Sequence, residues 1–217
     1  IAVRAIGSFL PVGRISALNY AYILMLLPHG VFAMSLATTT FPTMSAQYAD
    51  GDLAGVRGTL ARAIRVLLFL TLPAAVGLFV LRAEIISLVF ELGEFGVDDR
   101  ALVASALAFF APGLVAYATV ELLTRGFYAL HDTATPVAVS VGTVLLNIGL
   151  CIALVQGMGM GHEALAFSLS LTTTVEMVLM WVLLGRRLPG WGLRSDGLFL
   201  SIAKSGIAAA TMGVALY

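Results

Sequence analysis

The sequence has 217 residues, of which 60% are hydrophobic and only 11% are charged. About a quarter of the residues in a soluble domain are charged, so 12 basic and 12 acidic side chains are too few for an ordinary water-soluble surface. The composition therefore predicts a membrane-embedded protein. The net charge of zero excludes a strongly basic nucleic-acid-binding surface. The single cysteine, Cys151, excludes a disulfide framework and a cysteine-based metal site.

Long stretches without charged residues locate the predicted membrane spans. The longest stretch, between Arg14 and Asp50, contains 35 uncharged residues. A helix needs about 20 apolar residues to cross the hydrocarbon core, so we predict an all-α protein, a polytopic helical membrane bundle. The predicted spans are 17–46, 60–81, 101–124, 136–156, 164–185 and 198–217. Residues 1–12 are expected to be the end of a preceding transmembrane helix, and the first residue, Ile1, indicates a piece of a longer protein.

The basic residues predict which connections between spans face the cytoplasm. Eight of them fall on one side of the membrane when the spans are followed in turn, and three fall on the other. The eight are Arg57, Arg62, Arg65, Arg125, Arg186, Arg187, Arg194 and Lys204, and the three are Arg14, Arg82 and Arg100. Because positive charge concentrates on the cytoplasmic side, the connections near 47–60, 125–135 and 186–197 are predicted to be cytoplasmic.

Three segments near the span ends have recognisable local patterns. Apolar residues at helical spacing from Leu53 to Leu67 predict either an amphipathic helix on the membrane surface or a plain helix end with snorkelling arginines. The apolar stretch from Ile85 to Leu92 is too short to span and is expected to lie in the interface. Thr135-Pro136 predicts an N-cap followed by proline at the first helical position.

No motif for catalysis or for cofactor binding is present. His162-Glu163 begins like the helix of a zinc protease, but Ala166 stands where the second histidine is required. Nucleophile elbows, phosphate loops and dinucleotide fingerprints are also missing from the sequence. We therefore predict no catalytic residue, no cofactor and no metal ligand, and a protein that is not an enzyme.

Polar residues at membrane depth are costly and are therefore candidates for function. Glu121 and Arg125 are four residues apart, so they share a helix face and either contact an anionic headgroup or form a local ion pair. Glu176 lies near the middle of its span and is expected to face the bundle interior or an aqueous cavity. Asn147 either lines a path or hydrogen-bonds to a neighbouring helix.

Prolines inside the spans predict bent helices. Pro28-His29-Gly30 falls in the middle of a span, where proline removes a backbone hydrogen bond. The freed groups are tolerated only against protein or water, so His29 is either a cavity residue or a packed one. Prolines in successive spans favour a transporter over a rigid scaffold. The predicted kinks are at Pro28, Gly30, Pro73 and Pro112.

Near the end of the chain, small residues recur at intervals of four. They are Ser201, Ser205, Ala209 and Gly213. Such a face allows two helices to approach each other closely, so the last span is expected to pack along this face.

Several motifs, in order and correctly spaced, resemble the MurJ/MviN family, the lipid II flippases. They are Leu27-Pro28-His29-Gly30-Val31-Phe32 with Ala37-Thr38 and Phe41-Pro42, then 69–78 (FLTLPAAVGL), 90–95 (FELGEF), 126–136 (GFYALHDTATP) and Asn147-Ile148. The resemblance covers nearly the whole chain, and it is specific as a set rather than motif by motif.

The resemblance implies a flippase fold with two helical lobes around a central cavity, plus further helices that form a lipid-tail groove. It implies alternating access that carries lipid II, the undecaprenyl-linked peptidoglycan precursor, to the outer leaflet of a bacterial inner membrane. Residues 13–185 would be helices of the C-terminal lobe, and 186–217 a cytoplasmic connection and an additional helix. The implied partners are lipid II, membrane lipids and an N-terminal lobe of the same protein, with no nucleic acid.

The sequence departs from the family at charged positions. Members usually carry Asp-Arg after the match to Tyr20-Ala21, where this chain has Tyr22 and Ile23, and Glu121 and Ala134 replace residues that are basic in some members. Phosphate recognition relies on Arg or Lys, so either Arg14 or Arg125 compensates or the cargo is different. The alternatives are an exporter of another polysaccharide-lipid or drug, or a non-transporting membrane interaction homologue. The candidate substrate path comprises Arg14, Asn19, Tyr20, His29, Glu121, Arg125, Asn147 and Glu176.

Overall fold

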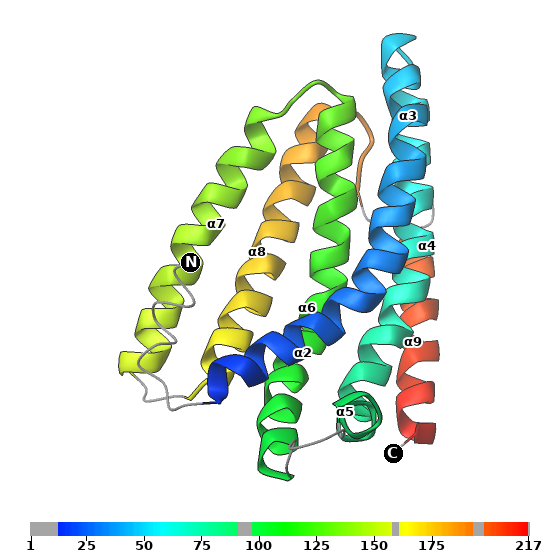
Figure 1. Cartoon of the computed structure of the whole chain (residues 1–217). Coiled ribbons are helices and arrows are strands. Elements are labelled where there is room, and N and C mark those ends of the chain that lie inside the picture. Colours follow the sequence, from blue (N-terminus) through cyan, green and yellow to red (C-terminus); the bar gives the residue numbers. More distant parts are fainter. Residues whose placement is uncertain (1–12, 91–96, 158–160, 193–197, 217) are drawn as a thin grey trace.

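The structure is a computed structural model that describes residues 13–90, 97–157, 161–192 and 198–216. Within these ranges it contains only helices and their connections, which confirms the predicted all-α class (Figure 1). The elements are α2 (Arg14–Pro28), η1 (His29–Met34), α3 (Ser35–Ala49), α4 (Leu53–Val80), α5 (Arg82–Phe90), α6 (Val97–Ala129), α7 (Ala134–Ile152), η2 (Ala153–Gly157), α8 (Glu163–Arg187) and α9 (Leu198–Leu216).

Among the described residues, five helical stretches are long and apolar enough to cross a membrane. They are Arg14–Ala49, Leu53–Val80, Asp99–Ala129, Ala134–Gly157 and Glu163–Arg187. The sixth predicted span, 198–217, is present as α9 (Leu198–Leu216), in which the apolar stretch Leu200–Leu216 is shorter than the other five. The described residues therefore confirm five of the six predicted spans at full length. The expected helix end at 1–12 lies outside the described residues.

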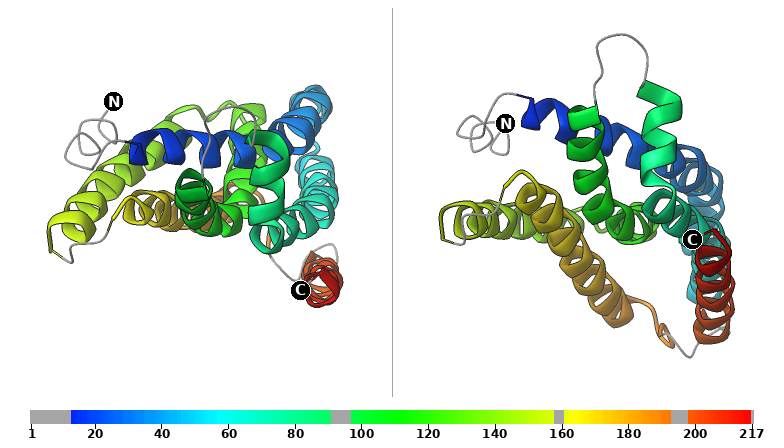
Figure 2. Two further views of the ribbon diagram at one scale, coloured as in Figure 1. Left: turned by 60° about the horizontal axis from the view of Figure 1, so that its bottom comes forward. Right: turned by 90° about the horizontal axis from the view of Figure 1, so that it is seen from below.

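Helix α6 lies at the centre of the bundle and packs against α2, α4 and α8 (Figures 1 and 2). Two apolar clusters share it. One cluster includes Leu107 and Leu114 of α6 and is completed mainly by α2. The other includes Leu122 and Phe127 and is completed mainly by α4. All four of these side chains are fully buried, so α6 holds both halves of the bundle together.

The start of α4 is a packed helix end rather than a helix on the membrane surface. The helix runs unbroken from Leu53, and its apolar stripe at Val56, Leu60 and Ile64 is fully buried in the bundle. Gly126 of α6 permits this contact, because a Cβ atom there would lie 2.9 Å from Leu60 Cδ2. Of the two predicted alternatives for this segment, the plain helix end is confirmed.

The first span bends where Pro28 ends α2. The six residues of η1, from His29 to Met34, form a π-helical segment, and Figure 1 shows α2 and α3 meeting there at an angle. A local widening of this kind bends a helix. Pro73 and Pro112 lie inside α4 and α6, both of which continue through them as α-helix.

The short apolar segment before residue 91 forms α5. This helix has nine residues, and Figure 1 shows it end on, so it lies across the axis of the bundle. Leu88 and Val89 remain exposed. A transverse helix with exposed apolar residues at one end of the bundle fits the predicted interfacial position.

The described parts of the three connections that were predicted to share one side of the membrane begin at the upper end of the bundle in Figure 1. Each of them contacts the other two. The Tyr48 and His131 rings are 5.3 Å apart, Arg187 pairs with Asp132 at 3.0 Å, and Arg57 donates to the Pro189 carbonyl at 3.0 Å. These contacts tie the three connections into one layer.

Helix α7 is capped by Asp132, not by Thr135 as predicted. The helix begins at Ala134, and the Asp132 carboxylate accepts hydrogen bonds from the Thr135 backbone N–H at 3.0 Å and from its hydroxyl at 2.7 Å. Thr135 lies inside the first turn, so its N–H needs an acceptor from outside the helix. Partial burial tends to raise the pKa of Asp132, but the hydrogen bonds from Thr135 and the Arg187 charge together lower it.

We predict that Asp132→Ala lowers the unfolding free energy of the full-length protein by about 1 kcal/mol through loss of the cap. Asp132→Asn retains a capping oxygen, so it should cost less. The pKa of Asp132 is lower in the folded protein than in the unfolded chain, where it is about 3.9. The charge of Asp132 therefore stabilises the fold fully above pH 3.9, and this stabilisation is lost as the pH falls through the folded-state pKa. Thermal unfolding in nanodiscs between neutral and acidic pH measures both effects. Asp50→Asn, at an exposed position, is the control.

Helices α6 and α8 approach closely at Gly113. A Cβ atom there would lie 2.9 Å from Ser170 Cβ, and the Ser170 hydroxyl donates to the Phe109 carbonyl at 2.7 Å.

We predict that Gly113→Ala separates these helices and destabilises the protein by about 1–3 kcal/mol. Gly149→Ala on α7, where an added Cβ would meet no described atom within 4 Å, should be tolerated. Equal melting temperatures for the two variants would contradict the close contact at Gly113.

Candidate functional site

A polar cluster joins α2, η1 and α6 in the interior of the bundle. The hydroxyls of Tyr22 and Tyr117 are 2.9 Å apart, and the Tyr117 ring meets the His29 ring edge to face at 5.0 Å. His29 is only 7% exposed, and its Nε2 has no hydrogen-bond partner among the described residues. The bend at Pro28 brings His29 against Tyr117, so the bend and the cluster depend on each other.

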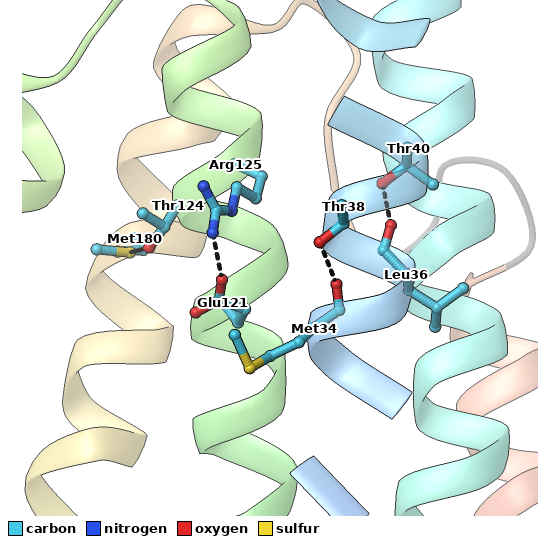
Figure 3. Close-up of polar contacts among 8 residues, drawn as sticks. All are labelled: Met34, Leu36, Thr38, Thr40, Glu121, Thr124, Arg125 and Met180. Atoms are coloured by element: carbon cyan, nitrogen blue, oxygen red, sulfur yellow. Dashed lines mark hydrogen bonds and ion pairs between the residues drawn. The ribbon is translucent and has the colours of Figure 1, made fainter. Parts of the chain in front are cut away.

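Charged residues continue the same face of α6. Tyr117, Glu121 and Arg125 follow one another at intervals of four, which places them on one side of a helix. Arg125 donates to Glu121 at 3.0 Å, and the side chains of both are partly exposed. In Figure 3 this pair lies on the side of α6 toward α3, whereas Thr124 points to Met180 of α8.

Glu176 of α8 lies at the level between the two apolar clusters. Its carboxylate accepts a hydrogen bond from the Ser140 hydroxyl of α7 at 2.6 Å. Glu176 is partly exposed rather than buried. A carboxylate at this depth with a neutral partner and remaining open surface can accept further hydrogen bonds from a ligand.

The polar cluster lies between the two apolar clusters of the bundle. On α6, one apolar cluster ends at Leu114 and the other begins at Ala118. On α8, Ala166 belongs to one cluster and Met180 to the other, with Glu176 between them. His29, Tyr117 and Glu176 therefore lie between the two apolar clusters. Together with Tyr22, Glu121 and Arg125, which lie next to them along α2 and α6, they form a polar layer inside the bundle.

The charge of this layer is not suited to binding phosphate unaided. Two carboxylates, Glu121 and Glu176, stand against one guanidinium, that of Arg125, which is already paired. Phosphate groups are bound by Arg or Lys donors. The layer instead offers carboxylates and tyrosine hydroxyls as hydrogen-bond partners for the hydroxyl groups of a sugar. Its tyrosine and histidine rings offer flat faces for the sugar ring.

Asn147 belongs to a separate, neutral network between α7 and α8. Its side-chain amide donates to Ser168 and Thr172 at 3.2 Å each, and the Cys151 sulfur lies 2.9 Å from the Ser168 hydroxyl. All four residues are buried. Of the two predicted roles for Asn147, the structure supports hydrogen bonding between helices.

The remaining predicted path residues lie away from the polar layer. Arg14 borders Gly161 and Glu163 near the start of α8. Asn19 is exposed on α2, and the Tyr20 ring packs against Phe90 of α5 at 4.8 Å. Ile23, which stands where the family usually carries arginine, is 50% exposed.

His162 joins two helices. Its Nε2 lies 2.9 Å from the Leu102 carbonyl and 3.1 Å from the Ser105 hydroxyl, and its Nδ1 lies 3.4 Å from Glu163. Among the described residues, no group of three or more His, Cys, Asp or Glu side chains could hold a metal ion. His162 therefore serves the packing of α8 against α6.

The predicted path missed three members of the layer, Tyr22, Tyr117 and Ser140. Tyr117 could have been found, because it lies one helical turn before Glu121 on the same face. Ser140 carried no usable signal, since its contact with Glu176 depends on how α7 and α8 are aligned.

Among the described residues, five helices of spanning length with polar side chains between them define a polytopic helical membrane protein. The family model for lipid II flippase MurJ matches residues 1–217, so the chain belongs to this family. Its members are transporters and not enzymes, in agreement with the absence of catalytic motifs from the sequence.

Individual relatives agree with this assignment. A "Probable lipid II flippase MurJ" of Rhizobium meliloti is 33% identical over 94% of this chain and 38% of its own length. One of Vibrio cholerae is 31% identical over 81% of this chain and 33% of its own length. The structure of a "Lipid II flippase MurJ, inward closed conformation" superposes with a TM-score of 0.84 at 25% identity, covering 99% of this chain and 43% of that one. The chain thus spans about two fifths of the length of these relatives or less.

A double-mutant cycle tests the link between α2 and α6. Tyr22→Phe and Tyr117→Phe each remove the same hydroxyl contact, so the double variant should be about as stable as either single one. The coupling energy should be about 0.6 kcal/mol and at most about 1.7 kcal/mol, the average and the maximum measured for hydrogen bonds between membrane helices. Chemical unfolding in detergent gives the four free energies, with Tyr128→Phe as the control. Strictly additive effects would refute the contact.

Proposed function

We propose that this chain is part of a flippase that moves lipid II from the inner to the outer leaflet of a bacterial inner membrane by alternating access. The observation that carries the proposal is the match of nearly the whole chain to a lipid II flippase structure at a TM-score of 0.84. The polar layer within the spans supports it, because a polar headgroup crossing the membrane needs partners at that depth.

In this proposal residues 13–185 are helices of the C-terminal lobe, and 186–217 contribute a connection and one additional helix. The layer formed by the connections near 47–60, 125–135 and 186–197 faces the cytoplasm. Its basic residues, Arg57, Arg186 and Arg187 among them, support this orientation. The partner is the N-terminal lobe of the same protein, which completes the cavity around lipid II and neighbouring membrane lipids.

The chemistry of the polar layer suggests a division of labour between the lobes. Glu121, Glu176 and the Tyr22–Tyr117 pair offer hydrogen-bond partners to the sugars of the cargo. The pyrophosphate needs cations that this lobe does not supply in excess, so the N-terminal lobe would provide them. Arg125 would bind the pyrophosphate only if its ion pair with Glu121 opens.

A second candidate cargo is another lipid-linked polysaccharide or a drug. Tyr22 and Ile23 stand where the family carries Asp-Arg, and the layer has more carboxylates than cations. This combination favours a cargo with less phosphate. A non-transporting membrane interaction homologue is the remaining alternative, and it would require no charge at membrane depth.

Complementation decides among these functions. Cells depleted of their own lipid II flippase should grow and stop accumulating inner-leaflet lipid II when they receive the full-length gene. Continued accumulation would refute lipid II as the cargo. Binding of labelled lipid II to the purified full-length protein then separates a change of cargo from a failure of expression.

Within a complementing protein, Glu176→Gln should slow transport about tenfold or more, because a hydrogen bond to a charged group contributes roughly 1.5–3 kcal/mol. Glu176→Asp should retain part of the activity. Glu163→Gln, which changes the carboxylate of the first residue of α8, is the matched control. Translocation of labelled lipid II in proteoliposomes is the measurement. Full activity of Glu176→Gln at normal protein levels would remove Glu176 from the path.

A further inference from the structure

The ring of His162 is buried at the end of the bundle where α6 and α8 both begin. Only 1% of the His162 side chain is exposed. Figure 1 shows that this end lies opposite to the end where the three connections begin. His162 is separate from the polar layer and makes contact with none of its members in the described hydrogen bonds. A titratable ring that is buried in this way needs a defined partner for each of its two nitrogens.

Two acceptors on α6 fix a proton on one ring nitrogen of His162. The His162 Nε2 lies 2.9 Å from the Leu102 carbonyl oxygen and 3.1 Å from Ser105 Oγ. The Ser105 hydroxyl already donates to the Leu102 carbonyl at 3.0 Å, and a carbonyl oxygen only accepts. Nε2 is therefore the donor to both. The neutral ring is the tautomer with its proton on Nε2, and its Nδ1 carries a lone pair.

The lone pair on Nδ1 faces a carboxylate. Glu163 Oε2 lies 3.4 Å from the His162 Nδ1, and Nδ1 has no hydrogen-bond partner among the described residues. Two acceptors at this distance repel each other, and the ring cannot turn away without losing its contacts with α6. A proton on Nδ1 replaces this repulsion with a charge-assisted hydrogen bond. The site therefore has a place for one additional proton.

The other charged groups near this pair come from α2 and α6. Arg14 Nη1 and Glu163 Oε2 crowd the same side of Gly161, where a Cβ atom would lie 2.9 Å from the first and 2.8 Å from the second. Asp99 and Arg100 lie in the first turn of α6. Helix α7, the other neighbour of α8, contains no charged residue. Arg14 is thus the competing partner for the Glu163 carboxylate, which is 32% exposed and can turn between the two.

We propose that Nδ1 of His162 is a proton-binding site that makes the contact between the starts of α6 and α8 depend on pH. With the additional proton, the ring donates from Nδ1 to Glu163 and from Nε2 to α6, so the first turn of α8 is held to α6. Without it, the ring keeps only its contacts with α6, and Glu163 turns toward Arg14. Histidine is the side chain that ordinarily changes its charge between pH 5 and pH 8. In the orientation proposed above, this end faces outward, so the proton comes from outside the cytoplasm.

Amide hydrogen exchange of the full-length protein in nanodiscs tests the site. The Ala164 and Leu165 amides donate to the Gly161 and His162 carbonyls, so they report on the first turn of α8. Their protection, corrected for the intrinsic pH dependence of exchange, should increase about fivefold from roughly pH 8 to pH 5, the upper limit for a partly exposed ion pair.

Two substitutions should abolish this increase. His162→Gln keeps a donor toward Leu102 but takes up no proton, and Glu163→Gln removes the acceptor. Above neutral pH, Glu163→Gln should change neither protection nor transport, because the ring is then neutral. Glu84→Gln, which changes an exposed carboxylate of α5, is the matched control and should retain the increase.

Nitrogen NMR of the imidazole ring gives a second readout that does not depend on any variant. The His162 signals should show a proton on Nε2 alone at the higher pH and on both nitrogens at the lower pH. Equal protection at the two pH values, an equal loss of the increase in Glu84→Gln, or a neutral ring protonated on Nδ1 would each overturn the proposal. These measurements need no cargo, so their failure would leave the proposed transport of lipid II unaffected.

Discussion

The bundle depends on the close packing of α6 against its neighbours. Gly113 against Ser170 and Gly126 against Leu60 bring helices together where no larger side chain would fit. In a membrane, lipid tails are as apolar as leucine, so burial of apolar surface adds little, and close contact holds helices together. Because both apolar clusters share α6, a change in its packing would reach every span that contacts it.

The polar layer follows from the same arrangement. Two apolar clusters stacked along one helix leave a level between them where polar side chains meet protein partners instead of lipid. Tyr22 and Tyr117 satisfy each other there, as do Glu176 and Ser140. Within the described part of the chain, the His29 Nε2 has no hydrogen-bond partner, and Glu121 and Glu176 are partly exposed. These groups can therefore act on a ligand.

The sequence predicted what depends on composition and local spacing. Charge gaps placed the spans, arginines grouped the connections, and Pro28 marked the bend. Other features depend on packing between helices and could not be predicted. The alignment of Ser140 with Glu176 is one example. The cap of α7 was placed at Thr135 because a threonine before proline has a strong local signal, whereas the structure uses Asp132.

The bend at η1 connects the packing to the proposed transport. Residues of α2 such as Leu24 belong to one apolar cluster, whereas Met44 of α3 belongs to the other. The π-helical segment between them carries His29, and a Cβ atom added to Gly30 would meet no described atom within 4 Å. Gly30 is therefore uncrowded at the bend, and η1 is the segment of the first span that lies between the two apolar clusters. In the flippase that we propose, the first span would change its bend at η1, and a ligand that contacts His29 would act on this segment.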